Sequence, residues 1–561
     1  MTNPWCLALF VEDAAISQTE RNWLTKAAEE RALVLLCPSP AAVEVQIGET
    51  PYRVVRRDEN VERKLREICA NEGIAELCIV RGGKRVKEAG PKRSLPRRAA
   101  SRCKSAVTAW VQRARSTVSA AALMQVEPSE RQALQAACAR ADTHPRRLMV
   151  VSQIAAFDKG SCAYWKLLQQ QLSDVGVLHL SETPRSSDAA LCEKLDGVWH
   201  RARWAAFPYG FPQRMRGRVP KARKAGATPA VRAAAQNLAL RFPTLGQEGA
   251  WALSLYLQEL FALALDTFRP SAVLMWNAFT ASHQILASEM RKRRIPALYM
   301  EFGILPGTMG FDLRGQMGQS ALAHEPLLPM PQDALDEAAQ VIAYLSRRQL
   351  NRYAQYADDA SHVIRLPKHR GRVITLIGQN DYESGICPYD ETARQEHSPW
   401  YASTADALAE LAEVCQARGD TLVFRPHPTM PPQTEPLPRN VLYSRGGNLF
   451  SLLEQSDLVV TLMSQVGYEA LLHHRNVLML GRCQLSGKGC VWERRPQESL
   501  RDAVERAVSG GYTPQMRQSF QCHIAHVIRD YAFDDMTARE LRYGQTPAQW
   551  LRLLNTVWND K

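Results

Sequence analysis

The sequence lacks the patterns by which cysteines hold metals or cross-link small secreted domains. Its thirteen cysteines are an odd number, and none belongs to a C-x-x-C pair. This spacing suits neither a disulfide framework nor a zinc site, so we expect a reducing compartment. An H-E-x-x-H motif is also missing, and no D-x-D follows an expected strand. We therefore expect no metal site.

A secretion signal and a membrane-crossing segment are missing as well. Residues 1–15 have no basic region ahead of their apolar run, and they continue into acidic residues, unlike a signal peptide. The longest apolar segment, residues 251–268, is interrupted by Gln258, Glu259 and Asp266, which is typical of a buried amphipathic helix. We expect a cytoplasmic protein.

Positive charge is abundant but unevenly distributed. The 561 residues carry a net charge of +13, and residues 81–115, from Arg81 to Arg115, hold twelve Lys or Arg against the single acid Glu88. Residues 214–224 and 291–294 form two further basic clusters. Such patches attract polyanions, including anionic lipid surfaces. For residues 81–115 two readings stay open: a surface that docks on an anionic membrane, or a solvated linker.

Strand and helix patterns alternate in three successive segments of the chain. Residues 1–140 read as an accessory α/β module with a basic tail. Residues 145–357 and residues 366–540 each read as buried apolar strands separated by helices, which predicts two doubly wound, mostly parallel sheets. Residues 541–561 predict a C-terminal helix whose apolar stripe packs back across another domain.

Some of the expected elements can be placed by residue. Strands are expected at residues 7–11, 33–36 and 77–80 of the first segment. A long helical stretch is expected over residues 231–268, and a helix over residues 465–474.

This layout describes the GT-B architecture of glycosyltransferases. The expected fold class is α/β, with two Rossmann-like doubly wound domains of GT-B type and an additional N-terminal α/β module. The same layout suits a sugar-nucleotide epimerase, so the fold alone does not give the chemistry.

The stretch from residue 421 to residue 482 carries the features of a ligand site. An apolar strand runs into Arg425-Pro426-His427-Pro428, and a second buried strand is followed by Ser464 and a helix. Open parallel sheets bind ligands beyond the carboxyl ends of their strands. A helix N-terminus capped by serine is suited to phosphate. The sequence therefore predicts a nucleotide-sugar site.

Five motifs follow one another in a fixed order along the chain. They are W-N (Trp276, Asn277), Y-M-E-F-G-I-L-P-G-T-M-G-F-D-L-R-G (residues 299–315), G-Q-N-D (residues 378–381), R-P-H-P (residues 425–428) and S-x-x-G-x-E-A-L-L (residues 464–472). This ordered set resembles the capsule polysaccharide biosynthesis family, and the resemblance covers roughly residues 145–540. Members of that family include retaining β-Kdo transferases of bacterial capsule assembly.

The resemblance implies a transferase that uses CMP-Kdo and works by double displacement. It implies Asp381 as the carboxylate nucleophile and Glu301 as the general acid/base. The alternative for Asp381 is a structural role in a turn, and in that case Glu383 is the other candidate for the nucleophile. Asp312 and Arg314 are candidates for ordering the loop after Glu301.

The donor-binding residues are expected on the two later motifs. His427, held between two prolines, fits a phosphate contact, and Glu469 fits a ribose contact or a loop-ordering role. The full expected set is Arg425, His427, Pro428, Ser464, Gln465, Gly467 and Glu469.

The expected partners are a nucleotide-sugar donor and a glycolipid or glycan acceptor, with docking on an anionic membrane surface through Arg81–Arg115 and no nucleic acid. No cofactor is expected beyond the donor substrate CMP-Kdo. Two alternatives stay open: a GT-B transferase or epimerase that uses a UDP-sugar, and a catalytically inactive scaffold that binds polyanions.

Overall fold

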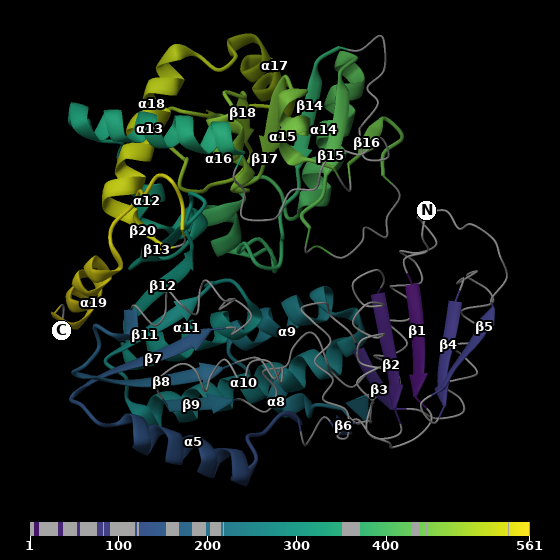
Figure 1. The fold of residues 1–561 in the computed structure, drawn as a ribbon, viewed down its shortest axis with the longest axis vertical. Helices are drawn as coiled ribbons and strands as arrows, with labels where there is room; N and C mark the ends of the chain where they lie inside the picture. Colours follow the sequence, from purple (N-terminus) through teal and green to yellow (C-terminus); the bar gives the residue numbers. More distant parts are fainter. Residues whose placement is uncertain are drawn as a thin grey trace. The chain divides into compact units, whose positions relative to one another are not determined.

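The computed structural model of the protein divides into two compact units (Figure 1). One comprises Met1–Val118 with Gly210–Arg216, and the other Ser119–Tyr209 with Gly217–Lys561. The structure describes residues 5–10, 32–37, 53–56, 76–81, 84–89, 118–119, 123–152, 168–181, 198–201, 215–216, 218–349, 371–428, 430, 437–444, 447–536 and 538–559.

The first unit contains a five-stranded sheet in the order β3-β2-β1-β4-β5. Its strands are parallel except β5, which pairs antiparallel with β4. The bounds are β1 (Trp5–Phe10), β2 (Ala32–Cys37), β3 (Arg53–Arg56), β4 (Glu76–Arg81) and β5 (Lys84–Ala89).

The three strands expected in this part of the chain correspond to β1, β2 and β4. Strand β5 was not expected, because it lies at the start of the basic stretch, where charge suggested a linker. Lys84, Arg85 and Lys87 therefore lie on an edge strand, where charged residues discourage pairing with another chain. Residues 90–115 lie outside the described residues.

Seven strands form the first sheet of the second unit, in the order β20-β13-β12-β11-β7-β8-β9. Strands β12 to β9 are parallel, whereas β13 and β20 run antiparallel to their neighbours. Every residue of β11 is buried, as expected for a strand covered on both faces. The bounds are β7 (Arg146–Ser152), β8 (Val175–Ser181), β9 (Val198–Arg201), β11 (Ala272–Trp276), β12 (Ala297–Phe302), β13 (Thr308–Asp312) and β20 (Ala532–Asp534).

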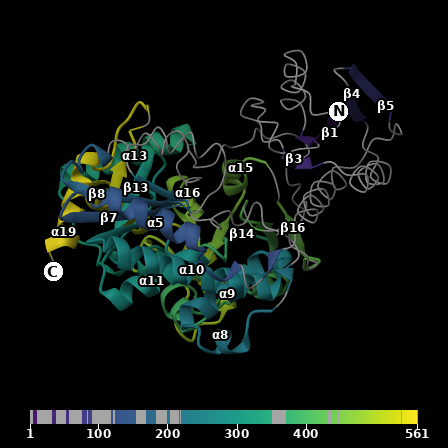
Figure 2. The same ribbon diagram turned by 90° about the horizontal axis from the view of Figure 1, so that it is seen from below.

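The helices of this part include α5, which lies alongside β8 and β9 (Figure 1); Figure 2 shows the same helix and strand β8 from below. The bounds are α5 (Pro128–Ala141), α8 (Lys221–Ala225), α9 (Pro229–Arg241), α10 (Gly246–Phe268), α11 (Ala281–Arg293), α12 (Ala321–His324) and α13 (Gln332–Arg348). The short strands β6 (Val118–Ser119) and β10 (Met215–Arg216) form a separate pair.

The helical stretch expected over residues 231–268 is present, but it is divided into two helices, α9 and α10. A short 3-10 turn, η3 (Pro243–Leu245), separates the two helices. Pro243 has no N–H with which to continue the hydrogen bonds of α9. Gly246 adopts φ 66°, a conformation that favours glycine, and the chain starts α10 there.

The second sheet has six parallel strands in the order β16-β15-β14-β17-β18-β19. Their bounds are β14 (Val373–Ile377), β15 (Thr421–Arg425), β16 (Val441–Tyr443), β17 (Leu458–Thr461), β18 (Val477–Met479) and β19 (Trp492–Glu493). The accompanying helices are α14 (Thr404–Arg418), α15 (Leu449–Glu454), α16 (Val466–Leu472), α17 (Leu500–Gly510) and α18 (Pro514–His526).

After α18 the chain returns to the first sheet. A π-helical turn, η6 (Val527–Tyr531), leads into β20, which pairs with β13. The last helix, α19 (Trp550–Asn559), lies beside β11 and β12 (Figure 1). Its Trp550 and Leu554 are fully buried in one apolar core with Trp276 and Phe311 of the sheet.

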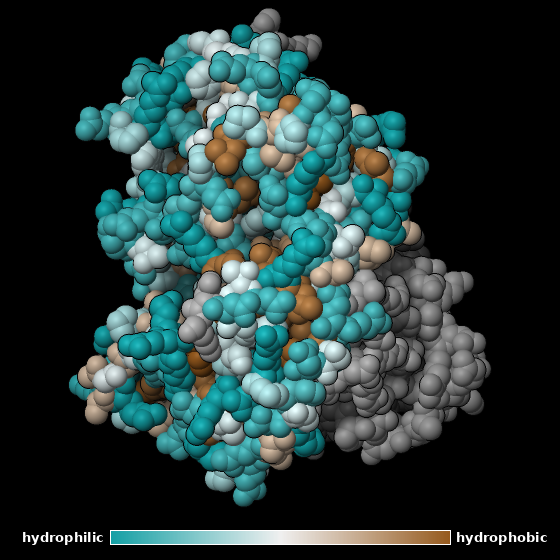
Figure 3. Space-filling view, turned by 90° about the vertical axis from the view of Figure 1, so that its left-hand side faces the viewer, coloured by the Kyte–Doolittle hydropathy of each residue, from teal (hydrophilic) through white to brown (hydrophobic). Residues whose placement is uncertain are grey.

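Two sheets with flanking helices in the second unit, and a third sheet in the first, confirm the expected α/β fold class. The domain boundaries expected from the sequence stay predictions. On the face in Figure 3, hydrophilic side chains cover most of the surface and apolar ones gather in small patches. Among the described residues, no helix is both long enough and apolar enough to span a membrane.

Candidate active site

The second sheet reverses its strand order at β14. From β14 the chain adds β15 and β16 on one side, and then β17, β18 and β19 on the other. Open α/β sheets bind ligands in the crevice outside the carboxyl ends of the strands at such a reversal. Three of the expected motifs stand at this edge: residues 378–381 after β14, residues 425–428 after β15 and residues 464–472 after β17.

Asp381 is buried at this edge, with 6% of its surface exposed. One carboxylate oxygen accepts a hydrogen bond from the backbone N–H of Thr404 (2.9 Å), and the other from the Thr404 hydroxyl (2.6 Å). Thr404 is the first residue of α14, so Asp381 ties the loop after β14 to that helix start. Burial raises the pKa of the Asp381 carboxyl to about 6, and the two bonds from Thr404 oppose the rise.

Glu383, the competing carboxylate, is more open, with 28% of its side chain exposed. It forms an ion pair with Arg241 of α9 and accepts a hydrogen bond from the side chain of Asn380 (2.8 Å). The two carboxylates therefore differ in environment: Asp381 is held by neutral donors in a buried position, and Glu383 by a cation at a partly exposed one.

Two asparagines of the first sheet's half hold the loop that carries these carboxylates. Asn237 of α9 is fully buried and donates to the carbonyl oxygen of Cys387 (2.7 Å). Asn277, which follows β11, donates to the carbonyl oxygen of Glu383 (3.2 Å). Asn277 adopts φ 52°, which asparagine tolerates better than most residues. The two halves of the second unit are thus joined at the loop after β14.

The segment after β15 lies against the start of that same loop. The N–H of Gly378 donates to the carbonyl oxygen of Arg425 (2.8 Å). A Cβ at Gly378 would lie 3.2 Å from the backbone nitrogen of His427, so glycine permits the close approach. His427 is partly exposed and Pro428 is exposed. The Arg425 guanidinium donates to the carbonyl oxygen of Gly447 (3.0 Å), so it is engaged by the loop before α15.

The segment after β17 differs in detail from expectation. Helix α16 begins at Val466 and has Gln465 as its N-cap, so Ser464 precedes the cap. The Ser464 hydroxyl still accepts a bond from the N–H of Val466 (3.3 Å). The helix ends at Leu472 and not at residue 474, where a positive φ of 56° at His474 departs from helical geometry. Gly467 and Glu469, both expected in the donor site, are buried within it.

Gln465 connects this segment to the other expected catalytic region. Its amide donates to the carbonyl oxygens of Gly303 (2.8 Å) and Ile304 (2.5 Å), in the turn that joins β12 to β13. Glu301 lies two residues before that turn, in β12, opposite Gly310 of β13. The structure therefore brings the segment after β17 next to the turn that follows Glu301.

The environment of Glu301 includes the phenol of Tyr531. The pKa of Tyr531 is raised, chiefly by burial, and the charges of Asp312 and Glu301 add to the rise. Asp312 orders the following loop, as the sequence indicated: its carboxylate accepts bonds from the backbone N–H groups of Arg314 (2.7 Å) and Ala321 (2.9 Å).

Thr404, Asn237 and Arg241 were not expected from the sequence. The serine and threonine at residues 403–404 signalled only a helix start. Asn237 is a polar residue on the buried face of an otherwise apolar helix, which is a weak signal on its own. Within the described residues, no group of three or more His, Cys, Asp or Glu could hold a metal ion.

Residues 417–524 match the sequence model of the capsule polysaccharide biosynthesis protein family, a segment that includes two of the five motifs. No curated protein matches the sequence.

Solved structures match over longer stretches but with low scores. A Thermosulfurimonas dismutans KpsC, beta Kdo 2,7 transferase, is 14% identical over 74% of this chain and 99% of its own, with a TM-score of 0.36. A second structure, a Thermosulfurimonas dismutans KpsC, beta Kdo 2,4 transferase, is 19% identical over 43% of this chain and 79% of its own, with a TM-score of 0.32. A putative UDP-N-acetylglucosamine 2-epimerase from Listeria monocytogenes is 10% identical over 74% of this chain and 97% of its own, with a TM-score of 0.27.

Proposed function

Because residues 417–524 of this chain match the sequence model of the capsule polysaccharide biosynthesis protein family, we propose that the protein is a glycosyltransferase of capsule or other surface-glycan assembly. The observation that carries the proposal is the convergence of three motif loops at the strand-order reversal of the second sheet, with the buried carboxylate of Asp381 among them. Such a reversal is the place where α/β sheets bind nucleotides.

The donor that we propose is CMP-Kdo, which the motif resemblance implies. CMP leaves with a single phosphate, so the site needs to stabilise less charge than a diphosphate would bring. His427 stands at the carboxyl edge of the sheet and is partly exposed there, and we place its ring against a phosphate oxygen of the donor. The segment after β17, with Ser464, Gln465, Gly467 and Glu469, completes the proposed donor site.

The reaction that we propose is a retaining double displacement. A carboxylate oxygen of Asp381 bonds to the anomeric carbon of the donor, and the bond from that carbon to the phosphate oxygen breaks, so CMP leaves with the electron pair. Each Asp381 oxygen accepts one bond from Thr404, which leaves lone-pair capacity for the attack. Burial favours this role, because a poorly solvated carboxylate has less water to shed before it attacks.

In the second step an acceptor hydroxyl attacks the same carbon from the opposite face. The bond to the Asp381 oxygen breaks and the free carboxylate is regenerated, while the hydroxyl proton passes to the carboxylate of Glu301. The Gln465 contacts with Gly303 and Ile304 support this pairing, because they hold the turn after Glu301 against the segment after β17.

Nucleotide-dependent thermal stabilisation tests the donor assignment. CMP should stabilise the protein by about 2.7 kcal/mol at a concentration of about 100 times its Kd. His427→Ala should remove this stabilisation. His474→Ala is the matched control, because His474 is an exposed histidine outside the motif loops, and it should keep the full effect.

The same assay separates the alternatives. Stabilisation by UDP but not by CMP would replace CMP-Kdo with a UDP-sugar and favour a transferase or epimerase of that class. Stabilisation by acidic polysaccharide, with no response to CMP, UDP or GDP, would favour an inactive scaffold.

Docking on an anionic membrane through residues 81–115 is a separate proposal, supported by the charge of that stretch. Its test is co-sedimentation with vesicles that contain an anionic lipid. Neutralising the basic residues should release the protein, because each contributes about 1 kcal/mol near such a surface. Unchanged sedimentation at low salt would reject the docking role and leave the transferase proposal untouched.

A further inference from the structure

Asn237 is a polar residue in the second half of α9, and its side chain is completely buried. The side-chain nitrogen donates to two carbonyl oxygens of the loop after β14, those of Cys387 (2.7 Å) and Tyr382 (3.4 Å). Tyr382 directly follows Asp381 in the chain, and the N–H of Cys387 donates to the carbonyl oxygen of Asp381 (2.9 Å). One amide therefore holds both the peptide next to Asp381 and the residue that binds the Asp381 backbone.

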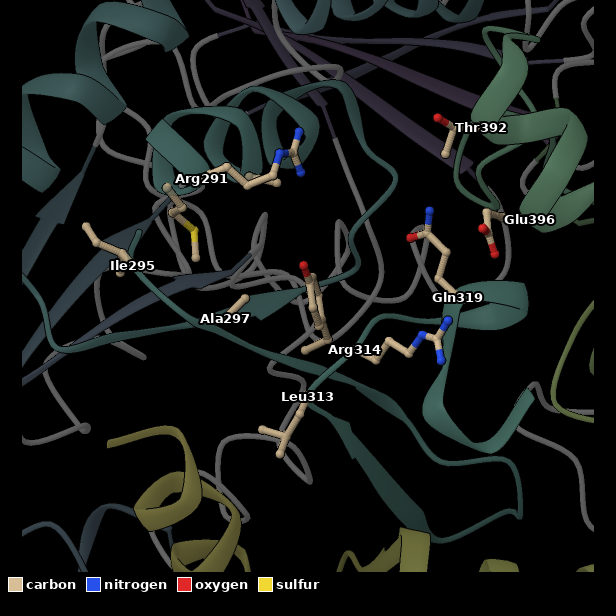
Figure 4. A pocket seen from close by; sticks show the side chains of 11 residues that line it. Arg291, Ile295, Ala297, Leu313, Arg314, Gln319, Thr392 and Glu396 are labelled. Atoms are coloured by element: carbon tan, nitrogen blue, oxygen red, sulfur yellow. The ribbon is translucent and has the colours of Figure 1, made fainter. Parts of the chain in front are cut away.

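The chain leaves this loop toward solvent. Residues 389–392 are exposed and lead into the π-helical turn η5 (Ala393–His397). Thr392 borders a cavity of about 420 Å³, which Arg291 of α11 also lines (Figure 4). Within the loop, the side chain of Ile386 is fully buried in the apolar core. Apolar burial is not directional, whereas a hydrogen bond fixes both distance and angle. The bonds from the α9 amide therefore set the orientation of the loop backbone.

An amide at this position costs stability that an apolar side chain would not. The Oδ1 atom of Asn237 is buried and finds no partner among the described residues, and an unsatisfied buried acceptor is destabilising. Asparagine is also a weaker helix former than leucine. The other buried residues of α9 are apolar, namely Val231, Ala234, Ala235 and Leu238. What a leucine of similar volume could not supply here is the pair of bonds to the loop.

We propose that Asn237 is a positioning residue for Asp381, which orients the loop so that the carboxylate stays on Thr404 and away from water. Thr404 holds the carboxylate itself, whereas Asn237 holds the backbone that carries it. The consequence for sugar transfer rests on the proposed function, in which Asp381 is the nucleophile. The position of the carboxylate does not rest on it. A displacement of about 1 Å at a reacting group slows a reaction by about 100-fold.

The ionisable groups near the Asp381 carboxyl lie on several elements. Its pKa is raised chiefly by burial, and the charge of Asp406 on α14 adds to the rise. Burial also raises the pKa of Tyr382 and that of Cys387, and the Asp381 charge adds to each rise. The charge of Arg241 on α9 opposes the rise at Tyr382. The side-chain amide of α9 is neutral, so replacing it changes the pKa of Asp381 only by moving the loop.

Asn237→Ala and Asn237→Leu test the proposal, because both lack the donor and leucine keeps the volume. The first readout is the melting temperature of the full chain at pH 4 and pH 7, with and without Asp381→Asn. In the wild-type background, the difference that Asp381→Asn makes should increase by about 3 °C between these pH values. In the Asn237 variants this increase should shrink toward zero, because a displaced loop admits water to the carboxyl and burial is the main cause of its raised pKa.

The second readout is the first burst of CMP released from CMP-Kdo without an acceptor, which reports the attack of Asp381 alone. Both Asn237 variants should slow this burst by about 100-fold. Both should keep the stabilisation by CMP, because His427 lies on a different loop. A residue that only supports the fold would lower stability without separating the rate from nucleotide binding in this way.

Asn476→Ala is the matched control. Asn476 is also buried, its side-chain nitrogen donates to the carbonyl oxygen of Ala507 (2.7 Å), and its Oδ1 likewise finds no partner among the residues that the structure describes. It directly precedes β18, at the edge of the second sheet opposite the candidate site. This variant should melt at a lower temperature but keep the wild-type pH dependence and the wild-type burst.

Wild-type pH dependence in both Asn237 variants would overturn the proposal, whatever their activity. A changed pH dependence with a wild-type burst would overturn the positioning role in the reaction, and so would the same changes in Asn476→Ala. If the wild-type protein released no CMP, the transferase would be rejected, and the pH readout would still decide whether Asn237 positions Asp381.

Discussion

The buried carboxyl of Asp381 should make the stability of the second unit depend on pH in a defined direction. Its pKa rises from 3.8 to about 6 in the folded protein, chiefly because of burial. The folded state therefore binds the proton more tightly than the unfolded state does. The stability that this group contributes is fully present below about pH 4 and is lost as pH rises through about 6. At about 1.4 kcal/mol per pKa unit, the loss amounts to about 3 kcal/mol.

Asp381→Asn tests this, because an amide of similar shape does not titrate. The melting temperature of the variant minus that of the wild type should increase by about 3 °C between pH 4 and pH 7, because unfolding a unit of about 440 residues carries an entropy of about 2.1 cal/mol/K per residue. Effects of the substitution that do not depend on pH, such as the loss of the bond from the Thr404 N–H, are the same at both pH values. They therefore cancel when the two melting-temperature differences are subtracted. Calorimetry at several pH values measures it.

Asp390→Asn is the matched control. Asp390 is exposed in the same region, and its side chain accepts a bond from the N–H of Ala393 (2.8 Å), which asparagine can replace. The melting difference of this variant should stay nearly flat with pH. A flat difference for Asp381→Asn as well would refute the reasoning, because the Asp381 carboxyl would then ionise as readily in the folded protein as in the unfolded chain.

Three further predictions concern Glu301, Gly318 and Gln465. Glu301→Gln should slow sugar transfer by about 10²–10⁴-fold while CMP still stabilises the protein, since it removes a proton acceptor and not a donor contact; equal losses of both would contradict the assigned role. Gly318→Ala should lower the melting temperature, because its Cβ would lie 1.7 Å from the backbone oxygen of Glu396, whereas Gly226→Ala, with no contact shorter than 3.4 Å, should not. Gln465→Ala should speed hydrogen exchange in the turn at residues 303–308, and unchanged exchange would show that its two bonds hold nothing in place.

Local patterns in the sequence were enough to locate the loops of the candidate site. The apolar run before residue 378 and the one before Arg425 read as buried strands, and parallel strands put the residues that follow them at one edge. The order of the strands is a long-range property. That β14 lies between β15 and β17, which creates the reversal, follows from the structure and not from any local pattern.

The contacts that define the state of Asp381 could not be read from the sequence. Thr404 lies 23 residues away and Asn237 lies in the other half of the unit, so only folding brings them to this loop. The break between α9 and α10, in contrast, could have been predicted from the sequence. Pro243 and Gly246 both indicate a helix boundary, but the apolar periodicity continues across them and favoured a continuous helical stretch. The basic cluster at residues 291–294 was visible, but not which of its arginines faces a cavity.

The most direct test of the central claim is mass spectrometry of the protein incubated with CMP-Kdo and no acceptor. The account predicts release of CMP and one Kdo residue bound as an ester to Asp381, with no adduct on Asp381→Asn. An adduct on Glu383, or transfer at wild-type rates by Asp381→Asn, would contradict the assignment of the nucleophile, and a product of inverted configuration would contradict the covalent mechanism itself.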